Sequence, residues 1–174
     1  MARIAVLTVS DRAFRGEYED RGGPACEAWL RGVITSEVEI LRQITPDGRV
    51  EVAAALRDLA DTWGADLILA TGGTGPAPRD QTPEAMADVI TMELAGFGEA
   101  MRAANSRVVA TAILSRQSAG VRGKTLIITL PGSPNAISTS LEAIFAAVPY
   151  CLDLIGAARI ETDPAVIKAH RPKT

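Results

Sequence analysis

The chain has 174 residues, of which 47% are hydrophobic and 22% are charged, and its formal net charge is −3. This length suits one domain with a continuous core, and the composition is typical of a globular protein. A slightly negative chain without a dominant basic stretch is not expected to coat nucleic acid, and no run reaches the roughly 18 apolar residues of a membrane span. We therefore expect one globular domain with no nucleic-acid or membrane partner.

Short apolar runs rich in β-branched residues alternate with longer segments of helical periodicity. The predicted strands cover residues 3–10, 38–44, 67–71 and 125–130. The predicted helices cover residues 22–34, 50–63, a segment that begins near residue 82, 96–106 and 137–155. This alternation predicts right-handed crossovers and a three-layer α/β/α fold with a mainly parallel sheet. Segment 110–130 does not fit the alternation, and it predicts a hairpin or a small antiparallel excursion beside the main sheet.

Single residues indicate where several of these helices begin or end. Thr82 is expected as an N-cap with Pro83 in the first helical position, and Gly64 is expected as a C-terminal cap. Pro149 should disturb the last predicted helix, because its ring removes a backbone N–H.

The cysteines and the chain ends carry little chemistry of their own. Cys26 and Cys151 lie in apolar, helix-like stretches, which predicts small core residues rather than a disulfide or a metal pair. The N-terminal sequence reads as a strand and not as a signal peptide, so we expect a cytoplasmic protein. We also expect one domain over residues 1–162, followed by a surface extension over residues 163–174.

Polar residues follow four of the predicted strands, at the point where each strand ends. These loops are SDR (10–12), TPDG (45–48), GGTGPAPRDQTPEA (72–85) and PGSPN (131–135). The carboxyl ends of parallel strands share one edge of a sheet, and ligands of open α/β sheets bind there. The four loops therefore predict one binding site at this edge.

The third of these loops is rich in glycine. Gly72, Gly73 and Gly75 allow successive backbone N–H groups to face an anion such as phosphate, and the dipole of the following helix would add positive charge. The loop lacks the Lys-Ser/Thr end of a P-loop and the spacing of a dinucleotide fingerprint. A tight turn without a ligand explains a lone GGTG equally well.

Two carboxylates follow the strand ends, at Asp47 and Asp80. They could hold Mg²⁺ between themselves and phosphate oxygens, because Mg²⁺ commonly takes one or two carboxylates and draws its other ligands from water and substrate. Asp47 also fits the turn that Pro-Asp-Gly forms. Asp80 also fits a local helix cap, although Thr82 fills that role better. Asp80 is therefore the stronger functional candidate of the two.

Arg12 and Arg79 would bring positive charge suited to phosphate, although either side chain also fits a solvated surface. Ser10 and Ser133 could bond a phosphate or a polar ring edge, or cap a helix. The only histidine, His170, lies near the C-terminus, and no Cys/His cluster has the spacing of a zinc site. Glycine N–H groups, arginines and paired carboxylates without a nucleophile–base pair indicate phosphoryl or nucleotidyl transfer.

Four stretches of the chain resemble the molybdopterin adenylyltransferases, the MogA-type enzymes related to the G domain of gephyrin and to plant molybdenum-insertion proteins. They are LTVSDRAFRGEYEDRGGPA (7–25), TGGTGPAPRDQTPEA (71–85), MELAGFGEAMR (92–102) and AILSRQSAGVRGKTLIITLPGSPNAI (112–137). The resemblance extends from about Arg3 to about Tyr150. TGGTG followed by RDxTPEA and a separate LPGxP block is much more specific than a glycine loop alone.

The resemblance implies a homotrimeric α/β protein that transfers AMP from Mg-ATP to the phosphate of molybdopterin. Pyrophosphate would leave, and the product would pass to a molybdenum-insertion protein. The resemblance implies that Asp47 and Asp80 are the Mg²⁺-associated catalytic carboxylates. The residues that it places around the substrates are Ser10, Asp11, Gly72, Gly73, Thr74, Gly75, Arg79, Thr82, Ser115, Gly132, Ser133, Pro134 and Asn135.

The alternative is a carrier or scaffold that binds molybdopterin without chemistry. The related MoaB proteins share TGGTG and the acidic pattern, so these motifs alone do not separate the two functions. A pure carrier of an anionic ligand gains nothing from two carboxylates near its phosphate, whereas a metal-dependent transferase needs them. The presence of both Asp47 and Asp80 therefore favours the enzyme.

Overall fold

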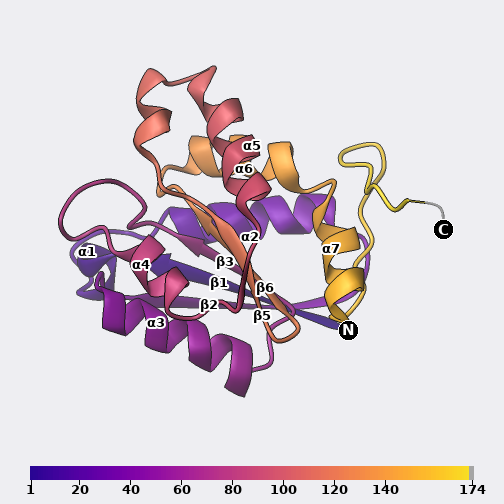
Figure 1. Cartoon of the computed structure of the whole chain (residues 1–174), viewed down its shortest axis with the longest axis horizontal. Coiled ribbons are helices and arrows are strands. Elements are labelled where there is room, and N and C mark those ends of the chain that lie inside the picture. Colours follow the sequence, from indigo (N-terminus) through magenta and orange to yellow (C-terminus); the bar gives the residue numbers. More distant parts are fainter. Residues whose placement is uncertain (173–174) are drawn as a thin grey trace.

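The computed structural model describes residues 1–172 and contains a six-stranded sheet between two layers of helices (Figure 1). The strand order is β2-β1-β3-β6-β5-β4. The strands are β1 (Ala2–Val9), β2 (Val38–Thr45), β3 (Leu67–Thr71), β4 (Met92–Glu93), β5 (Ala119–Arg122) and β6 (Thr125–Leu130). The first four strands in this order are parallel, whereas β5 pairs antiparallel with β6, and β4 pairs antiparallel with β5. The mainly parallel sheet and its antiparallel excursion are thereby confirmed.

Helices cover both faces of the sheet. They are α1 (Asp11–Phe14), α2 (Gly22–Val33), α3 (Arg49–Arg57), α4 (Thr82–Ala87), α5 (Ala95–Ser106), α6 (Pro134–Ile144) and α7 (Val148–Ile155). A π-helical turn, η1 (Asp58–Thr62), continues α3, and a 3₁₀ turn, η2 (Ala110–Leu114), follows α5. Figure 1 shows α3 and α4 on one side of the sheet, and α2, α5 and α6 on the other.

Alternate residues of the strands enter two separate cores, one on each face. In β1, Ile4 and Val6 pack towards α2 and α6, whereas Ala5 and Leu7 pack towards α3 and α4. Full burial of a side chain such as Ile4 contributes roughly 1.5–3 kcal/mol. Strands β1, β3 and β6 are buried on both faces, which is why they are largely continuous apolar runs, whereas the edge strand β2 is only partly buried and includes exposed Glu39 and Arg42.

The four parallel strands end together. Val9 pairs with Thr45, and Thr71 pairs with both Thr8 and Leu130. The loops that leave these strands therefore share one edge of the sheet, which we call the rim. It lies at the left of Figure 1, near the labels of α1 and α4.

Two predicted helices differ in detail from the structure. Segment 137–155 is not one helix, because α6 ends at Ile144 and α7 runs at 65° to it. Pro149 lies in the first turn of α7, where its missing N–H costs no helical bond. The helix predicted over 50–63 divides into α3 and η1, and Gly64 follows with φ of +74°, as a C-terminal cap requires.

Cys26 is fully buried and Cys151 is half-buried, and both are free thiols. Burial raises the pKa of the Cys26 thiol to about 12, because it disfavours the thiolate. After residue 162 the chain packs beside α7, where Arg171 donates to the carboxylate of Asp153 at 2.6 Å and to the carbonyl of Ile160 at 2.9 Å. The domain boundary at residue 162 stays a prediction.

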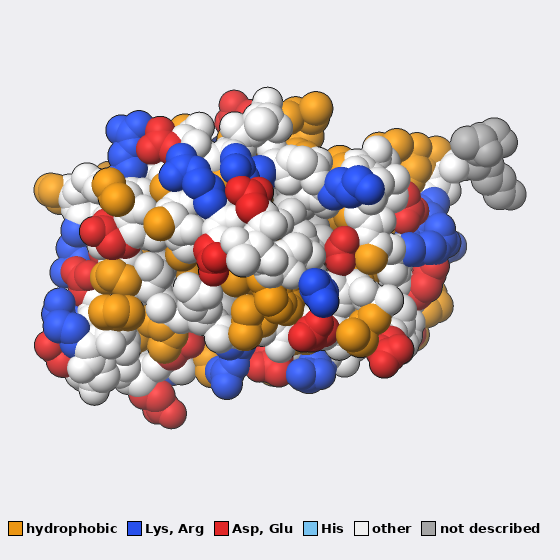
Figure 2. Space-filling model, turned by 90° about the horizontal axis from the view of Figure 1, so that it is seen from below, with side chains coloured by type: hydrophobic (Ala, Val, Ile, Leu, Met, Phe, Trp, Pro, Cys, Tyr) orange, Lys and Arg blue, Asp and Glu red, His pale blue; other side chains and the backbone are white. Residues whose placement is uncertain are grey.

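No single helix among residues 1–172 is long and apolar enough to cross a membrane. The bent pair α6 and α7 reaches the necessary apolar length together, but both helices contribute to the core on one face of the sheet. Acidic and basic side chains are interspersed over the surface on the side of α3 (Figure 2).

Candidate active site

Gly72 and Gly73 shape the loop that leaves β3. Their φ angles are +106° and +63°, a region that residues with a side chain avoid. A Cβ on Gly72 would overlap the carbonyl oxygen of Val9, and a Cβ on Gly73 would overlap the hydroxyl of Thr82. The backbone path itself therefore requires both glycines.

Thr82 holds this loop and does not cap the helix, which corrects our prediction. It is the first residue of α4, and Gln81 occupies the N-cap position. Its hydroxyl donates to the carbonyl of Gly72 at 2.9 Å, and its N–H donates to the carbonyl of Gly73 at 3.1 Å. Thr82 is fully buried, so its hydroxyl needs a protein partner, and the loop carbonyl provides one.

Three successive N–H groups of the loop have no protein acceptor within residues 1–172. They belong to Gly73, Thr74 and Gly75. The N–H of Gly72 donates to the carbonyl of Leu130 at 3.1 Å, so it continues the pairing of β3 with β6 and is not available. Successive free N–H groups in a tight loop form a concavity that binds anions.

Asp11 and Asp47 join the loops after β1 and β2. The N–H of Asp11 donates to Oδ2 of Asp47 at 2.9 Å, and the N–H of Asp47 donates to Oδ1 of Asp11 at 3.0 Å. Within residues 1–172, Oδ1 of Asp47 and Oδ2 of Asp11 accept no hydrogen bond. Oδ1 of Asp47 faces the glycine loop, since it lies 3.5 Å from the position of a Cβ on Gly73. The Asp47 side chain as a whole is only 8% exposed.

Arg79 places a positive charge between the same two carboxylates. Its Nη2 lies 3.2 Å from Oδ2 of Asp47 and 3.8 Å from Oδ2 of Asp11. The Arg79 side chain is 58% exposed, and an ion pair of this kind is worth only about 0–1 kcal/mol. The guanidinium can therefore turn from the carboxylates to a phosphate at little cost.

Asp80 lies on the loop that adjoins Asp47, but its carboxylate has a different partner. Oδ2 of Asp80 accepts the N–H of Ala77 at 3.2 Å and so closes its own turn. The two loops are linked by the N–H of Arg49, which donates to the side-chain oxygen of Gln81 at 3.0 Å. Residues 1–172 contain no group of three or more His, Cys, Asp or Glu arranged for a metal ion. A magnesium ion that shares its ligands with phosphates needs only one or two carboxylates.

The loop after β6 forms the other wall of the rim. The hydroxyl of Thr71 donates to the carbonyl of Pro131 at 2.7 Å, and a Cβ on Gly132 would lie 3.8 Å from the Cα of Gly72. Ser133 is the N-cap residue of α6, and its side chain makes no cap hydrogen bond. Pro134 and Asn135 form the exposed first turn of this helix, so its positive dipole end lies at the rim.

A cavity of about 230 Å³ opens beside Gly72 and Gly132. Ser10 lines it and caps α1, because its hydroxyl accepts the N–H of Ala13 at 3.2 Å. The cavity also contains Tyr18, which our sequence reasoning missed.

Two arginines that also line this cavity lie beside the ring of Tyr18. The guanidinium carbons of Arg12 and Arg21 lie 5.0 and 5.7 Å from the ring centroid. Asp20 lines the cavity as well, but its two oxygens accept the hydroxyl of Thr8 and the N–H of Gly23, each at 3.0 Å. An aromatic face with two cations suits a planar, anionic ligand. The spacing of these residues gave no signal of the cavity, because residues 15–21 form no regular element.

Ser115 and Arg116, which precede β5, contact the glycine loop at Thr74 and Gly75. The hydroxyl oxygens of Ser115 and Thr74 lie 3.3 Å apart, and Ser115 donates to the side-chain oxygen of Gln117 at 3.0 Å. Arg116 bonds the carbonyls of Gly75 and Asp80 and was also missed. The only signal for it was its place in the ILSR motif beside Ser115. Arg116 also lowers the pKa of Glu84, mainly through their hydrogen bond.

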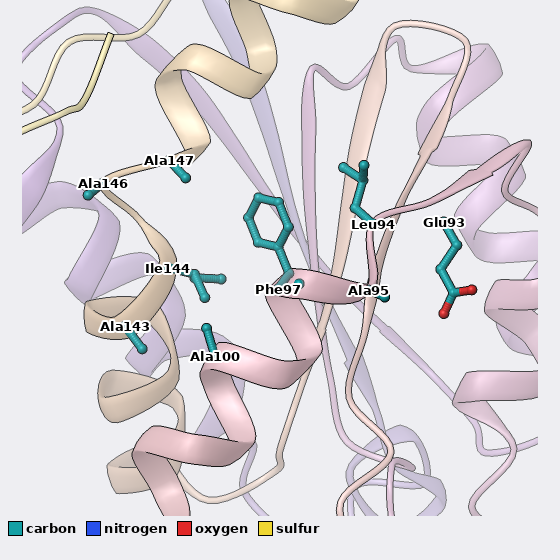
Figure 3. Close-up of a pocket in the computed structure, with 10 residues that line it drawn as sticks. Glu93, Leu94, Ala95, Phe97, Ala100, Ala143, Ile144, Ala146 and Ala147 are labelled. Atoms are coloured by element: carbon teal, nitrogen blue, oxygen red, sulfur yellow. The ribbon is translucent and has the colours of Figure 1, made fainter. Parts of the chain in front are cut away.

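An apolar groove of about 560 Å³ lies away from the charged loops, between α5 and the end of α6. Figure 3 shows Phe97, Leu94 and Ile144 around it, with Glu93 at its border. None of the predicted site residues line this groove. The polar chemistry is therefore concentrated at the rim and not in this apolar groove.

Known proteins are similar to this chain in both sequence and fold. Residues 5–150 match the family described as "Probable molybdopterin binding domain". A molybdopterin adenylyltransferase of Helicobacter pylori is 47% identical, over 98% of this chain and 97% of its own length. The molybdopterin adenylyltransferase of Escherichia coli K12 is 42% identical, over 99% of this chain and 94% of its own length.

Two solved structures superpose closely on this fold. The molybdopterin biosynthesis enzyme MoaB of Thermus thermophilus has a TM-score of 0.80 and 45% identity, and the alignment covers 89% of this chain and 96% of that protein. A MogA structure has a TM-score of 0.82 and 35% identity, with 88% and 99% covered. The match over residues 5–150 and the relatives that align over nearly the whole chain show that this protein belongs to the molybdopterin-binding domain family.

Proposed function

We propose that this chain is a molybdopterin adenylyltransferase of molybdenum cofactor biosynthesis. It transfers AMP from ATP to the phosphate of molybdopterin and releases pyrophosphate. The observation that carries the proposal is the row of free N–H groups at Gly73, Thr74 and Gly75 beside Asp47 and Arg79. The relatives that align over almost the whole chain bear the same name.

The reaction brings two strongly negative substrates together, so the protein must offset their repulsion. The free N–H groups of the glycine loop can receive phosphate oxygens, and Arg79 can exchange Asp47 for a phosphate. Arg12 and Arg21 add positive charge at the cavity beside Gly72. Positioning and charge neutralisation of this kind account for most of the catalysis of phosphoryl transfer.

The chemistry needs no histidine at the rim. An oxygen of the molybdopterin phosphate attacks the α-phosphorus of ATP, and the bond from that phosphorus to the oxygen bridging the β-phosphate breaks. Pyrophosphate leaves with the bridging oxygen. A phosphate monoester loses its last proton with a pKa of about 6, so the attacking oxygen is already deprotonated at neutral pH.

Asp47 and Asp80 are the proposed ligands of Mg²⁺. The donor set fits a hard cation, because Oδ1 of Asp47 accepts no hydrogen bond within residues 1–172 and faces the glycine loop. Oδ2 of Asp11 is a further open oxygen, and the guanidinium of Arg79 already lies between Asp11 and Asp47. When bound, the metal neutralises phosphate charge. Asp80 would complete the pair from the adjoining loop.

The resemblance also implies a wider setting, which we propose for this chain. It would act in the cytoplasm as a homotrimer and deliver adenylylated molybdopterin to a molybdenum-insertion protein. The apolar groove between α5 and α6 supports assembly, as do the exposed side chains of Met92, Val108 and Ile113. Light scattering that shows a stable monomer would contradict the proposed homotrimer.

Anaerobic incubation of the purified protein with molybdopterin and Mg-ATP tests the transferase. Adenylylated molybdopterin and pyrophosphate should form, and their rate should fall about 10²–10³-fold in Asp47→Asn and Asp80→Asn. Molybdopterin binding should stay largely intact in Asp80→Asn. Asp61→Asn is a matched control, because Asp61 also pairs with an arginine but lies at the other edge of the sheet.

The same experiment decides between the enzyme and the carrier. Tight molybdopterin binding by the wild-type protein without any product would make this chain a carrier or scaffold. Loss of molybdopterin binding together with activity in a folded Asp80→Asn variant would contradict the metal-binding role of Asp80.

A further inference from the structure

Arg116 lies between η2 and β5, and its guanidinium group bonds the loop after β3 and the first turn of α4. Nε and Nη2 donate to the carbonyl of Gly75 at 3.1 and 3.0 Å, and Nη2 also donates to the carbonyl of Asp80 at 2.6 Å. Nη1 donates to the carboxylate of Glu84 in α4, and the backbone N–H of Arg116 donates to the carbonyl of Thr74 at 2.8 Å. One residue therefore holds both ends of segment 75–80 and the helix that follows it.

Segment 75–80 carries two of the charged groups of the rim, Arg79 and Asp80. Residues 76–79 are exposed, and two of them are prolines, which donate no N–H. Inside the segment, the N–H of Asp80 donates to the carbonyl of Ala77 at 2.9 Å, and the N–H of Ala77 donates back to the Asp80 carboxylate. Within residues 1–172, the other bonds that join this segment to the protein come from Arg116 and from the exposed pairing of Arg79 with Asp47 and Asp11.

We propose that Arg116 is a positioning residue for adenylyl transfer. It fixes segment 75–80, so that the guanidinium of Arg79 and the carboxylate of Asp80 stand at the loop of Asp47. The inference rests on the proposed function, but it adds a residue that touches no substrate. All three nitrogens of the Arg116 guanidinium already have protein acceptors, so binding a phosphate would require them to release the loop.

The role requires arginine and not simply a positive charge. A planar guanidinium presents several donors in a fixed fork, which lets Arg116 bond two carbonyls and one carboxylate simultaneously. A lysine at this position keeps the charge and can still pair with Glu84, but its single nitrogen cannot span the carbonyls of Gly75 and Asp80 in the same geometry. Arg116→Lys therefore separates the positioning function from the charge.

Arg122, at the end of β5 that lies away from the rim, offers a matched control. Its Nε and Nη2 bond the carboxylate of Asp61, and Nη1 donates to the carbonyl of Val89 at 3.0 Å. The two arginines thus make comparable sets of bonds and are comparably exposed, at 39% and 27% of their side chains. Arg122→Lys measures the general effect of losing such a fork away from the rim.

The experiment compares Arg116→Lys and Arg122→Lys with the wild-type protein in two measurements. The first is steady-state adenylyl transfer, which separates kcat from the KM for Mg-ATP. We expect Arg116→Lys to lower kcat by about 10- to 100-fold, the scale of a misplacement of about 1 Å, with a much smaller change in KM. The second is hydrogen exchange of the unliganded protein, which should become faster in residues 75–82 of Arg116→Lys only.

Three results would overturn the inference. One is an unchanged kcat with unchanged exchange in Arg116→Lys, and another is an equal loss in Arg122→Lys. A raised KM for Mg-ATP with an unchanged kcat would make Arg116 a ligand contact instead. If the wild-type protein forms no product, the proposed function fails, and hydrogen exchange alone then decides whether Arg116 holds the segment.

Discussion

The two edges of the parallel sheet use aspartate in different ways. At the amino edge, Asp66 accepts the N–H of Arg3 at 2.8 Å on one oxygen and the N–H of Ala158 at 2.7 Å on the other. At the rim, Asp47 accepts one backbone N–H and one exposed guanidinium on the same oxygen, and its other oxygen accepts no bond within residues 1–172. A carboxylate with a backbone donor on each oxygen is a structural link, whereas one with an open oxygen can receive a ligand.

Glycine shows the same contrast. Gly73 and Gly123 have nearly equal φ angles, +63° and +58°. A Cβ on Gly123, in the turn between β5 and β6, would meet nothing within 4 Å, whereas a Cβ on Gly73 would overlap Thr82. The two glycines therefore share the conformation, but only Gly73 is closely packed against neighbouring side chains.

The largest expected effect is the difference between Asp47→Asn and Asp66→Asn. We expect Asp47→Asn to lower kcat about 10²–10³-fold, because it removes a carboxylate proposed to hold the Mg²⁺ that neutralises the transferring phosphates. Asp66→Asn weakens two charge-assisted hydrogen bonds and should lower the free energy of unfolding by about 2 kcal/mol, or the Tm by roughly 4–8 °C. Adenylyl-transfer assays and thermal unfolding of both variants check this. A loss of kcat in folded Asp66→Asn as large as in Asp47→Asn would contradict the contrast.

The sequence was sufficient to predict the four parallel strands and the four rim loops, because both signals are local, but it did not assign the short antiparallel strands β4 and β5. Strands β1, β3 and β6 are largely continuous apolar runs, β2 mixes apolar and polar residues, and each loop follows its strand directly. The parallel order then brings the loops together without any knowledge of side-chain contacts.

The partners of individual side chains could not be predicted in the same way. Asp11 and Asp47 are 36 residues apart, and their reciprocal bonds depend on β2 lying beside β1. Arg116 reaches Gly75 only because β6 pairs with β3 and carries the hairpin to that side. Thr82 shows the converse, because its capping propensity was overridden by a loop carbonyl that the sequence did not place nearby.

The next largest effect is expected from Gly73→Ala compared with Gly123→Ala. Both variants should lose about 1–2 kcal/mol of stability for placing a Cβ at positive φ. Gly73→Ala should lose a further 1–3 kcal/mol, on the order of an overpacked site, and about 10²-fold in kcat, because the loop must move away from Thr82. Chemical denaturation and activity assays measure both. Equal kinetics in the two variants would show that the glycine loop does not hold the reacting phosphates.

A smaller effect is expected from Arg79→Gln. This change removes an exposed cation from the rim, so the KM for Mg-ATP should rise about tenfold, the scale of one charged hydrogen bond to phosphate, with little change in Tm. Arg3→Gln is the matched variant at the amino edge, because Arg3 is similarly exposed and also pairs with a carboxylate. Steady-state kinetics should show no change in KM for Arg3→Gln. A KM that is equal in Arg79→Gln and the wild type would remove Arg79 from the substrate site.

The smallest effect is expected from acid, through the ion pairs Arg116–Glu84 and Arg122–Asp61. Hydrogen bonds from Arg116 and Arg122 lower the pKa of Glu84 and of Asp61, from ordinary values of 4.5 and 3.8. A lowered folded pKa stabilises the protein above the unfolded pKa, and this contribution is lost as the pH falls through the folded pKa. Both carboxylates are substantially exposed, so each should contribute only slightly to the fall in Tm below about pH 4.5.

Acid should nevertheless affect the two edges of the sheet differently, because only the Arg116–Glu84 pair anchors a rim loop. When Glu84 is protonated, Arg116 loses the charged acceptor that orients its guanidinium. Hydrogen exchange in residues 75–82 should therefore rise as the pH falls through the lowered pKa of Glu84, after correction for the intrinsic exchange rate. Glu84→Gln should already show part of this rise at neutral pH, whereas Asp61→Asn should leave it unchanged. An equal rise in hydrogen exchange in both variants would mean that acid unfolds the protein globally. The Glu84–Arg116 pair would then hold the loop no more than the Asp61–Arg122 pair does.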